Sequence, residues 1–173
     1  MRALAYWKAV TMDKAGFLEQ LIGLLAEGKF RYCIIGGQAV NAYVEPVVSL
    51  DLDFAVAADQ MEGLEALLTR SFPVKRFPHS LNVSSAGSDL RAQVQTDPRY
   101  AEFVERAAPR EVLGLVLPVA SLKDVLRGKV WAVQDPSRRP SKRQKDLADI
   151  ARLLEAHPRL RNQVPADILS RLF

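Results

Sequence analysis

The segment VSLDLDFAV, residues 48–56, alternates strictly between apolar and polar side chains. In an extended chain, Leu52 and Phe54 fall on one side and Asp51 and Asp53 on the other. This alternation is typical of a strand with one buried face. Asp is among the residues that strands tolerate least, and two carboxylates on the same face repel each other. The pair therefore contributes nothing to folding by itself, which points to a function.

A divalent cation between the two carboxylates would turn their repulsion into attraction. Mg²⁺ prefers oxygen ligands, keeps several waters, and is usually held by one or two carboxylates together with substrate phosphates. Two such ions can stabilise the attacking and leaving oxygens of an in-line phosphoryl displacement. Asp51 and Asp53 are therefore the predicted metal ligands. Taken alone, Asp-x-Asp on a strand is more often solvated surface.

A glycine pair lies upstream, between FRYCIIG (30–36), which reads as a short strand, and GQAVNAYV (37–44), which reads as a short helix. Gly36 and Gly37 leave room for a phosphate to approach the N–H groups at the start of that helix. A glycine pair after a strand is usually only a turn. Followed by Asp-x-Asp after thirteen intervening residues, it predicts a nucleoside triphosphate as ligand.

The remaining patterns predict a mixed α and β fold. Expected strands cover 30–36, 48–56, 80–85, 89–95 and 110–120; expected helices cover about 14–27, 37–44, a helix capped by Asp59, 98–107, Ser121 to about Val133, 142–156 and part of 165–173. We expect a core of residues 1–120 and a helical C-terminal extension of residues 121–173 packed on it.

The net charge of +4 comes from the end of the chain. Residues 1–133 carry 15 Lys and Arg against 15 Asp and Glu, whereas residues 134–173 carry 9 against 5. Most of the excess lies in SRRPSKRQK, residues 137–145, a block that could contact a polyanion or form a solvated turn. No apolar run approaches the roughly 20 residues of a membrane span, and a single cysteine excludes a disulfide within the chain. We therefore expect a cytoplasmic protein without a leader or membrane segment.

The stretch GGQAVNAYVEPVVSLDLDF (36–54) resembles the signature of the nucleotidyltransferase superfamily with the DNA polymerase β type of fold. There, Gly-Gly or Gly-Ser opens a helix and a hydrophobic-flanked Asp-x-Asp follows. The chain looks closest to small bacterial nucleotidyltransferases, including the toxins of abortive-infection toxin–antitoxin pairs. GKVWAVQDPSRRPSKRQKDLADIARLLE (128–155) is similar to their second motif, a Lys on one helix followed by basic residues and a Lys-Asp pair.

The resemblance covers about residues 30–156 and implies a mixed sheet flanked by helices with a helical C-terminal cap. It also implies a Mg²⁺-dependent transferase, with two ions, that moves a nucleoside monophosphate from an NTP to an RNA, a protein or a small molecule. An antitoxin is a further expected partner. The residues implied at the site are Asp51 and Asp53 for metal and Gly36, Gly37, Gln38, Lys129 and Lys145 for nucleotide, with Asp146 near the cleft.

The chain departs from the family at a third carboxylate, which usually lies on a neighbouring strand. In SDLRAQVQTDP (88–98), the central position is Gln93, and an amide cannot act as a base. Asp89 could serve if the strand register shifts by four residues. Two alternatives therefore stay open: a catalytically inactive nucleotide-binding module, and a protein that binds nucleic acid or a partner through residues 137–145.

Overall fold

The computed structural model describes residues 2–13 and 16–173. Among these residues, seven strands form one mixed sheet in the order β3-β4-β5-β2-β1-β7-β6. The pairs β1–β7 and β2–β5 are parallel and the others are antiparallel. The strands are β1 (Tyr32–Ile35), β2 (Asp51–Val56), β3 (Val74–Phe77), β4 (Ser80–Val83), β5 (Arg91–Gln95), β6 (Ala108–Val112) and β7 (Leu115–Val119).

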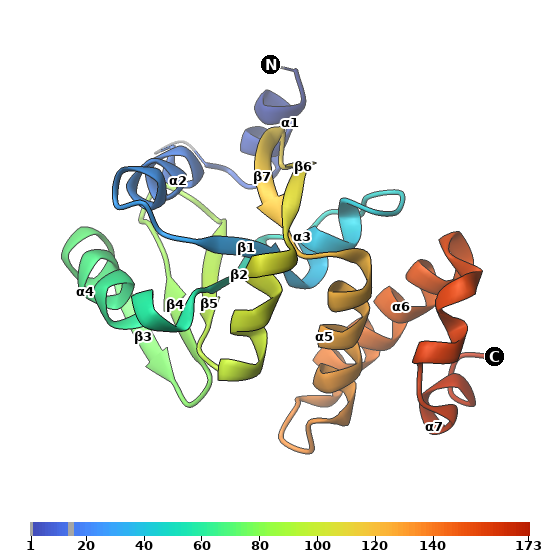
Figure 1. Ribbon diagram of the computed structural model, residues 1–173. Helices are drawn as coiled ribbons and strands as arrows, with labels where there is room; N and C mark the ends of the chain where they lie inside the picture. Colours follow the sequence, from blue (N-terminus) through green and yellow to red (C-terminus); the bar gives the residue numbers. More distant parts are fainter. Residues whose placement is uncertain (1, 14–15) are drawn as a thin grey trace.

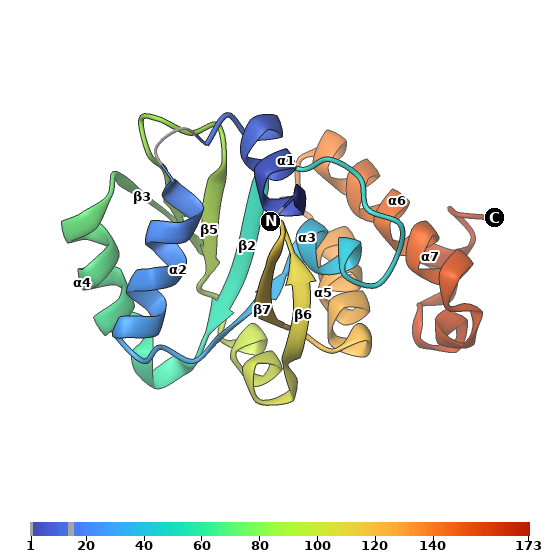
Figure 2. The same ribbon diagram turned by 90° about the horizontal axis from the view of Figure 1, so that it is seen from above.

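Helices cover both faces of this sheet. Figures 1 and 2 show α2 and α4 on one side and α3, α5 and α6 on the other. The α-helices are α1 (Arg2–Val10), α2 (Phe17–Glu27), α3 (Gly36–Asn41), α4 (Met61–Ser71), α5 (Leu122–Gln134), α6 (Pro140–Ala156) and α7 (Ala166–Leu169). Short 3₁₀ helices are η1 (Ala58–Gln60), η2 (Pro98–Arg106) and η3 (Pro158–Gln163). The predicted mixed α/β architecture is confirmed.

The alternation of apolar and polar side chains along β2 gives the strand one face that packs on α2 and α4 and one that faces α6. Leu52 and Phe54 are almost completely buried in the core, as are Phe17 of α2 and Leu64 of α4. Burying one such side chain contributes about 1.5–3 kcal/mol to folding. Asp51, on the opposite face, lies within ion-pair distance of α6. The apolar face of the central strand therefore holds the core together, and its polar face is turned toward the C-terminal helices.

Three local expectations differ from the structure. Asp59 does not cap a helix; it lies in η1 and forms an ion pair with Arg31 at 2.6 Å. The extended segment expected over residues 110–120 is part of the β6–β7 hairpin. Its turn has positive φ angles at Leu113 and Gly114. Because the residues around this turn are apolar, the sequence predicts one continuous extended segment. Residues 98–107 form a 3₁₀ helix in place of the expected α-helix.

The structure also contains elements that the sequence did not predict, among them α1, β3 and η3. By contrast, Ser121 caps α5 as expected, because its Oγ accepts a hydrogen bond from the N–H of Asp124 at 3.2 Å. The start expected for the first predicted helix, near Lys14, lies outside the described residues. Within the described ranges, no helix has both the length and the hydrophobicity needed to cross a membrane.

Candidate active site

A cleft of about 580 Å³ lies between the polar face of β2 and β5 and the first turns of α6. Both predicted metal ligands line it, together with Gly37. The loop before α6 and the start of that helix contribute a group of basic side chains: Arg138, Arg139, Lys142 and Lys145. The structure therefore brings the acidic pair, the glycine turn and part of the basic block into one place.

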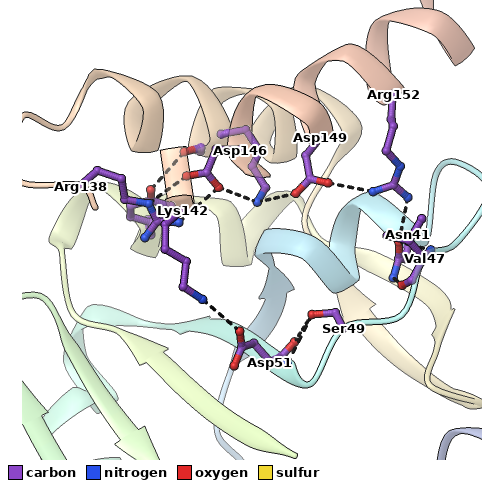
Figure 3. A network of polar contacts seen from close by, with 12 residues as sticks. Asn41, Val47, Ser49, Asp51, Arg138, Lys142, Asp146, Asp149 and Arg152 are labelled. Atoms are coloured by element: carbon purple, nitrogen blue, oxygen red, sulfur yellow. Dashed lines mark hydrogen bonds and ion pairs between the residues drawn. The ribbon is translucent and has the colours of Figure 1, made fainter. Parts of the chain in front are cut away.

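Two cations hold the Asp51 carboxylate. Its Oδ1 lies 2.9 Å from Arg91 Nε. Its Oδ2 lies 3.5 Å from Lys142 Nζ, a contact drawn in Figure 3. Arg91 reaches this position because β5 runs parallel to β2 with Arg91 directly opposite Asp51. The charge of Asp51 is thus compensated within the protein.

Asp53 has no such compensation. Its Oδ1 is enclosed, and no group among the described residues donates a hydrogen bond to it. The pKa of Asp53 is raised to about 6, mainly by burial and also by the nearby Asp51, while the charges of Lys129, Arg138 and Lys142 oppose the shift. An enclosed carboxylate without a partner is costly to keep ionised. A cation that arrives with a ligand would relieve this cost.

Gly36 makes the close approach of the two motifs feasible. Its φ angle is +68°, and a Cβ at this position would lie 2.3 Å from Asp53 Oδ2. A Cβ at Gly37 would have Ser49 Oγ, at 3.9 Å, as its nearest neighbour. The glycine requirement is therefore strict at Gly36, where both the backbone conformation and the space exclude a side chain.

Gly36→Ala is expected to destabilise the protein by about 1–3 kcal/mol, because it combines an unfavourable φ with a contact on Asp53. Chemical denaturation measures this loss. Gly37→Ala is the matched control and should change the unfolding free energy by no more than about 0.5 kcal/mol. Equal losses in the two variants would contradict the role assigned to Gly36.

A buried network of charges joins α5 to α6. Lys129 is only 7% exposed, and its Nζ lies 3.0 Å from Asp146 Oδ1 and 2.8 Å from Asp149 Oδ2. Arg138 donates a further hydrogen bond to Asp146 at 2.8 Å. Burial opposes the charged form of Lys129, but the attraction of Asp149 and Asp146 outweighs it, and the pKa of Lys129 is raised. The Lys129 ammonium is thus held by two carboxylates at the cleft wall.

The same network reaches the loop that leads into β2 (Figure 3). Arg152 donates to Asp149 at 2.8 Å and to the side chain of Asn41 at 2.9 Å. Asn41 in turn donates to the carbonyl of Val47 at 2.7 Å. The network therefore positions the C-terminal helices relative to the strand that carries the acidic pair.

The other predicted site residues occupy different environments. Lys145 is exposed in the cleft, and no carboxylate among the described residues pairs with it. Gln38 is buried and donates to the carbonyl of Ser49 at 3.0 Å, so its side chain supports the β2 loop. Asp89 is exposed before β5 and is not part of the cleft lining.

The register of β5 places Gln93 directly opposite Asp53. The Gln93 side chain donates to Ser80 Oγ at 3.1 Å. The four-residue shift that would bring Asp89 to this position is therefore not present, and we leave Asp89 out of the site.

Sequence reasoning missed Arg91 and Asp149, and it assigned no partner to Arg138. Arg91 lies on the same face of its strand as Gln93, so alternation places it on the polar side. Only the pairing of β5 with β2 reveals that it contacts Asp51. Asp149 follows Asp146 by three residues on one helix and shares its face.

A metal at Asp51 would have to displace Arg91, so Arg91→Gln is expected to tighten Mn²⁺ binding in the absence of nucleotide. A partly exposed ion pair is worth up to about 1 kcal/mol, so the gain should reach up to about fivefold. Electron paramagnetic resonance titration of free Mn²⁺ gives the affinity. Arg159→Gln removes an exposed charge outside the cleft lining and controls for net charge. Weaker Mn²⁺ binding in Arg91→Gln alone would contradict the competition.

The acidic pair fits a metal ion whose coordination is completed by a ligand. Across residues 2–13 and 16–173, no group of three or more His, Cys, Asp and Glu side chains could hold an ion by itself. Asp51 and Asp53 supply carboxylate oxygens, one of them enclosed without a partner. Mg²⁺ commonly takes its remaining ligands from water and substrate phosphates. The donor set therefore suits a metal that binds together with a phosphate compound.

No family model and no curated protein matches this sequence. Several solved structures match its fold. ANT(2'')-Ia in complex with adenylyl-2''-tobramycin is 15% identical, covers 91% of this chain and 97% of its own, and gives a TM-score of 0.59. The lincosamide antibiotic adenylyltransferase LnuA, with lincomycin bound, is 11% identical over 79% of this chain and 95% of its own, with a TM-score of 0.52.

A protein of Thermotoga maritima assigned as a nucleotidyltransferase, TM1012, is 12% identical over 76% of this chain and 88% of its own, with a TM-score of 0.51. The protein therefore shares the fold of these nucleotidyltransferases, a mixed sheet flanked by helices. The resemblance read from the glycine pair and the Asp-x-Asp motif is confirmed at the level of fold.

Proposed function

We propose that this protein is a Mg²⁺-dependent nucleotidyltransferase that moves a nucleoside monophosphate from an NTP to an acceptor and releases pyrophosphate. The enclosed, unpartnered Asp53 carboxylate carries this proposal. It lies beside Asp51 and against the Gly36 turn, in a cleft bordered by basic residues. This arrangement suits a ligand that combines a divalent cation with a chain of phosphates.

Asp51 and Asp53 would hold the metal. When bound, Mg²⁺ offsets the negative charge of the phosphates and makes the α-phosphorus more electrophilic. A cation at Asp51 would release Arg91 and Lys142 from their ion pairs, leaving both side chains free to bind the triphosphate. Lys145, which has no carboxylate partner among the described residues, would add a further positive charge.

The nearest support for the kind of acceptor comes from proteins of the same fold. The ANT(2'')-Ia structure is a complex with adenylyl-2''-tobramycin, and the structure of the lincosamide antibiotic adenylyltransferase LnuA has lincomycin bound. Both ligands derive from small molecules, which favours a small-molecule acceptor here as well. RNA or protein acceptors, an antitoxin partner and a cytoplasmic location stay predictions from the sequence.

The decisive experiment supplies each α-³²P-labelled NTP with Mg²⁺ to the protein in the presence of total cellular RNA, protein or small-molecule extract. Label on one of these fractions, together with pyrophosphate release, is the expected result. The variant with both Asp51→Asn and Asp53→Asn is the control and should transfer no label while it remains folded. Label transfer that survives in this variant would overturn the proposal.

One observation favours a second candidate, a nucleotide-binding module without catalysis. Gln93 lies opposite Asp53, and no free carboxylate there can accept a proton from an acceptor hydroxyl. Metal-dependent NTP binding without pyrophosphate release, measured by calorimetry and a phosphate assay, would select this candidate.

A third candidate follows from the basic side chains that line the cleft. A nucleic-acid-binding protein would show salt-sensitive RNA binding that survives Asp51→Asn and Asp53→Asn. The proposed transferase requires both carboxylates, so the same pair of substitutions separates the two functions.

A further inference from the structure

The cleft contains a restricted set of groups that could remove a proton from an acceptor. Besides Asp51 and Asp53, the carboxylates among its described lining residues are Asp135 and Asp146. Asp146 is buried between Lys129 and Arg138 and accepts hydrogen bonds from both. Asp135 Oδ1 accepts from the N–H and the hydroxyl of Ser137, at 2.9 and 2.7 Å.

These hydrogen bonds lower the pKa of Asp135, with the Ser137 hydroxyl making the largest contribution. A carboxylate with a lowered pKa is a weak base, and one held by two cations has no free lone pair directed at a substrate. Neither Asp135 nor Asp146 is therefore suited to deprotonate an alcohol.

The remaining described lining residue whose ring could accept a proton is His79, on the turn between β3 and β4. Its carbonyl pairs with Thr96, three residues beyond Gln93. Two strand spacings also separate it from β2, because β5 lies between β4 and β2. Strand geometry places its Cα about 14 Å from that of Asp53. His79 is therefore set back from Asp53 within the cleft and makes no direct contact with it.

The cleft also contains basic side chains that no carboxylate among the described residues pairs with. Arg139 and Lys145 both line it, and within the described part of the chain no carboxylate pairs with either. Arg91 and Lys142 would become available as well once a metal neutralises Asp51. This surplus lies in the same cleft in which no general base is found.

From these two observations we propose, on the basis of the function proposed above, that the acceptor presents a phosphomonoester and that its phosphate oxygen is the nucleophile. A phosphomonoester carries about −1.5 to −2 charge at pH 7, so it needs no base to become nucleophilic. Its charge also complements Arg139, which has no part in binding the triphosphate as proposed above and which an alcohol would leave unpaired.

The reaction balances without a proton acceptor. An oxygen of the acceptor phosphate forms a bond to the α-phosphorus of the NTP. The bond from that phosphorus to the oxygen bridging it to the β-phosphorus breaks, and pyrophosphate leaves with the electron pair. The product is a nucleoside diphosphate ester that contains a new P–O–P linkage.

Matched pairs of acceptors test this inference. Each α-³²P-labelled NTP is offered with Mg²⁺ to glycerol and glycerol 3-phosphate, to ribose and ribose 5-phosphate, and to glucose and glucose 1-phosphate. Inorganic [³²P]phosphate with unlabelled NTP is the minimal acceptor. We expect label only on phosphorylated members. Products from phosphomonoesters should resist phosphatase but be cleaved by a nucleotide pyrophosphatase, whereas inorganic phosphate should give a nucleoside diphosphate whose terminal label phosphatase releases. An RNA with a 5′-phosphate, compared with its 5′-hydroxyl form, distinguishes a nucleic-acid source of the same group.

Arg139→Gln should raise the KM for the phosphorylated acceptor by about fivefold, the upper value for an exposed charge pair. The KM for the NTP should change less. Arg159→Gln removes a charge outside the cleft lining and should change neither KM.

The outcomes separate this inference from the function on which it rests. Transfer to the hydroxyl members that is lost in Asp53→Asn overturns the phosphomonoester acceptor and leaves the nucleotidyltransferase intact. No label on any phosphorylated acceptor also overturns it. In that case, pyrophosphate release with cellular RNA, protein and small-molecule extracts decides whether the proposed function fails too.

Discussion

Asp53→Asn is expected to lower nucleotidyl transfer by about 1000-fold or more, yet to stabilise the metal-free protein. The loss follows because a metal site supplies several kcal/mol of transition-state stabilisation, and about 4 kcal/mol corresponds to 1000-fold. The gain follows because the substitution removes an enclosed carboxylate that has no partner among the described residues. Steady-state kinetics and denaturant unfolding in the presence of a chelator measure the two effects.

The stabilisation has a defined dependence on pH. The pKa of Asp53 is raised by burial from 3.8 to about 6 in the folded protein. Because the folded-state pKa is raised, protonated Asp53 contributes favourably to the free energy of unfolding. This contribution is fully present below about pH 4 and is lost as the pH rises through 6. At pH 8 the wild-type protein should therefore be less stable than Asp53→Asn by up to about 3 kcal/mol, and the difference should disappear near pH 4.

Asp51→Asn is the matched control for this prediction. It should impair transfer to a similar extent, because it removes the other metal ligand. It should not stabilise the protein, since Arg91 and Lys142 already compensate Asp51. Equal stabilisation in both variants, or none in either, would show that Asp53 is not the uncompensated member of the pair.

Lys129→Met is expected to destabilise the protein by about 3–5 kcal/mol, the usual cost of removing one partner from a buried ion pair. Asp146 and Asp149 would both lose their contact with the ammonium in a region where each is almost fully buried. Denaturant unfolding measures the loss. Lys123→Met, on an exposed position of the same helix, should change stability by no more than about 0.5 kcal/mol.

Combining Lys129→Met with Asp149→Asn should recover part of the lost stability, because it removes one of the two buried carboxylates that lose their ammonium partner. A double variant less stable than Lys129→Met would contradict this explanation. Activity should fall in Lys129→Met as well, because the network positions α6 and the loop before β2 (Figure 3).

The predicted roles of the basic residues show where sequence reasoning reached its limit. Lys129 and Lys145 were both assigned to the nucleotide by resemblance. The structure buries Lys129 between two carboxylates and leaves Lys145 exposed in the cleft. The difference depends on the orientation of α5 against α6, which the helical pattern of each segment does not contain.

Local sequence pattern alone was enough to identify β2, the glycine turn and the shared face of Asp51 and Asp53. The period of side chains along a strand and the conformational freedom of glycine are properties of the chain itself, independent of its neighbours. The partners of these residues were decided only by the tertiary structure. Arg91 and Gln93 face the acidic pair because β5 pairs with β2 in one particular register. Such a pairing joins segments far apart in the sequence, so its register depends on how the whole sheet packs.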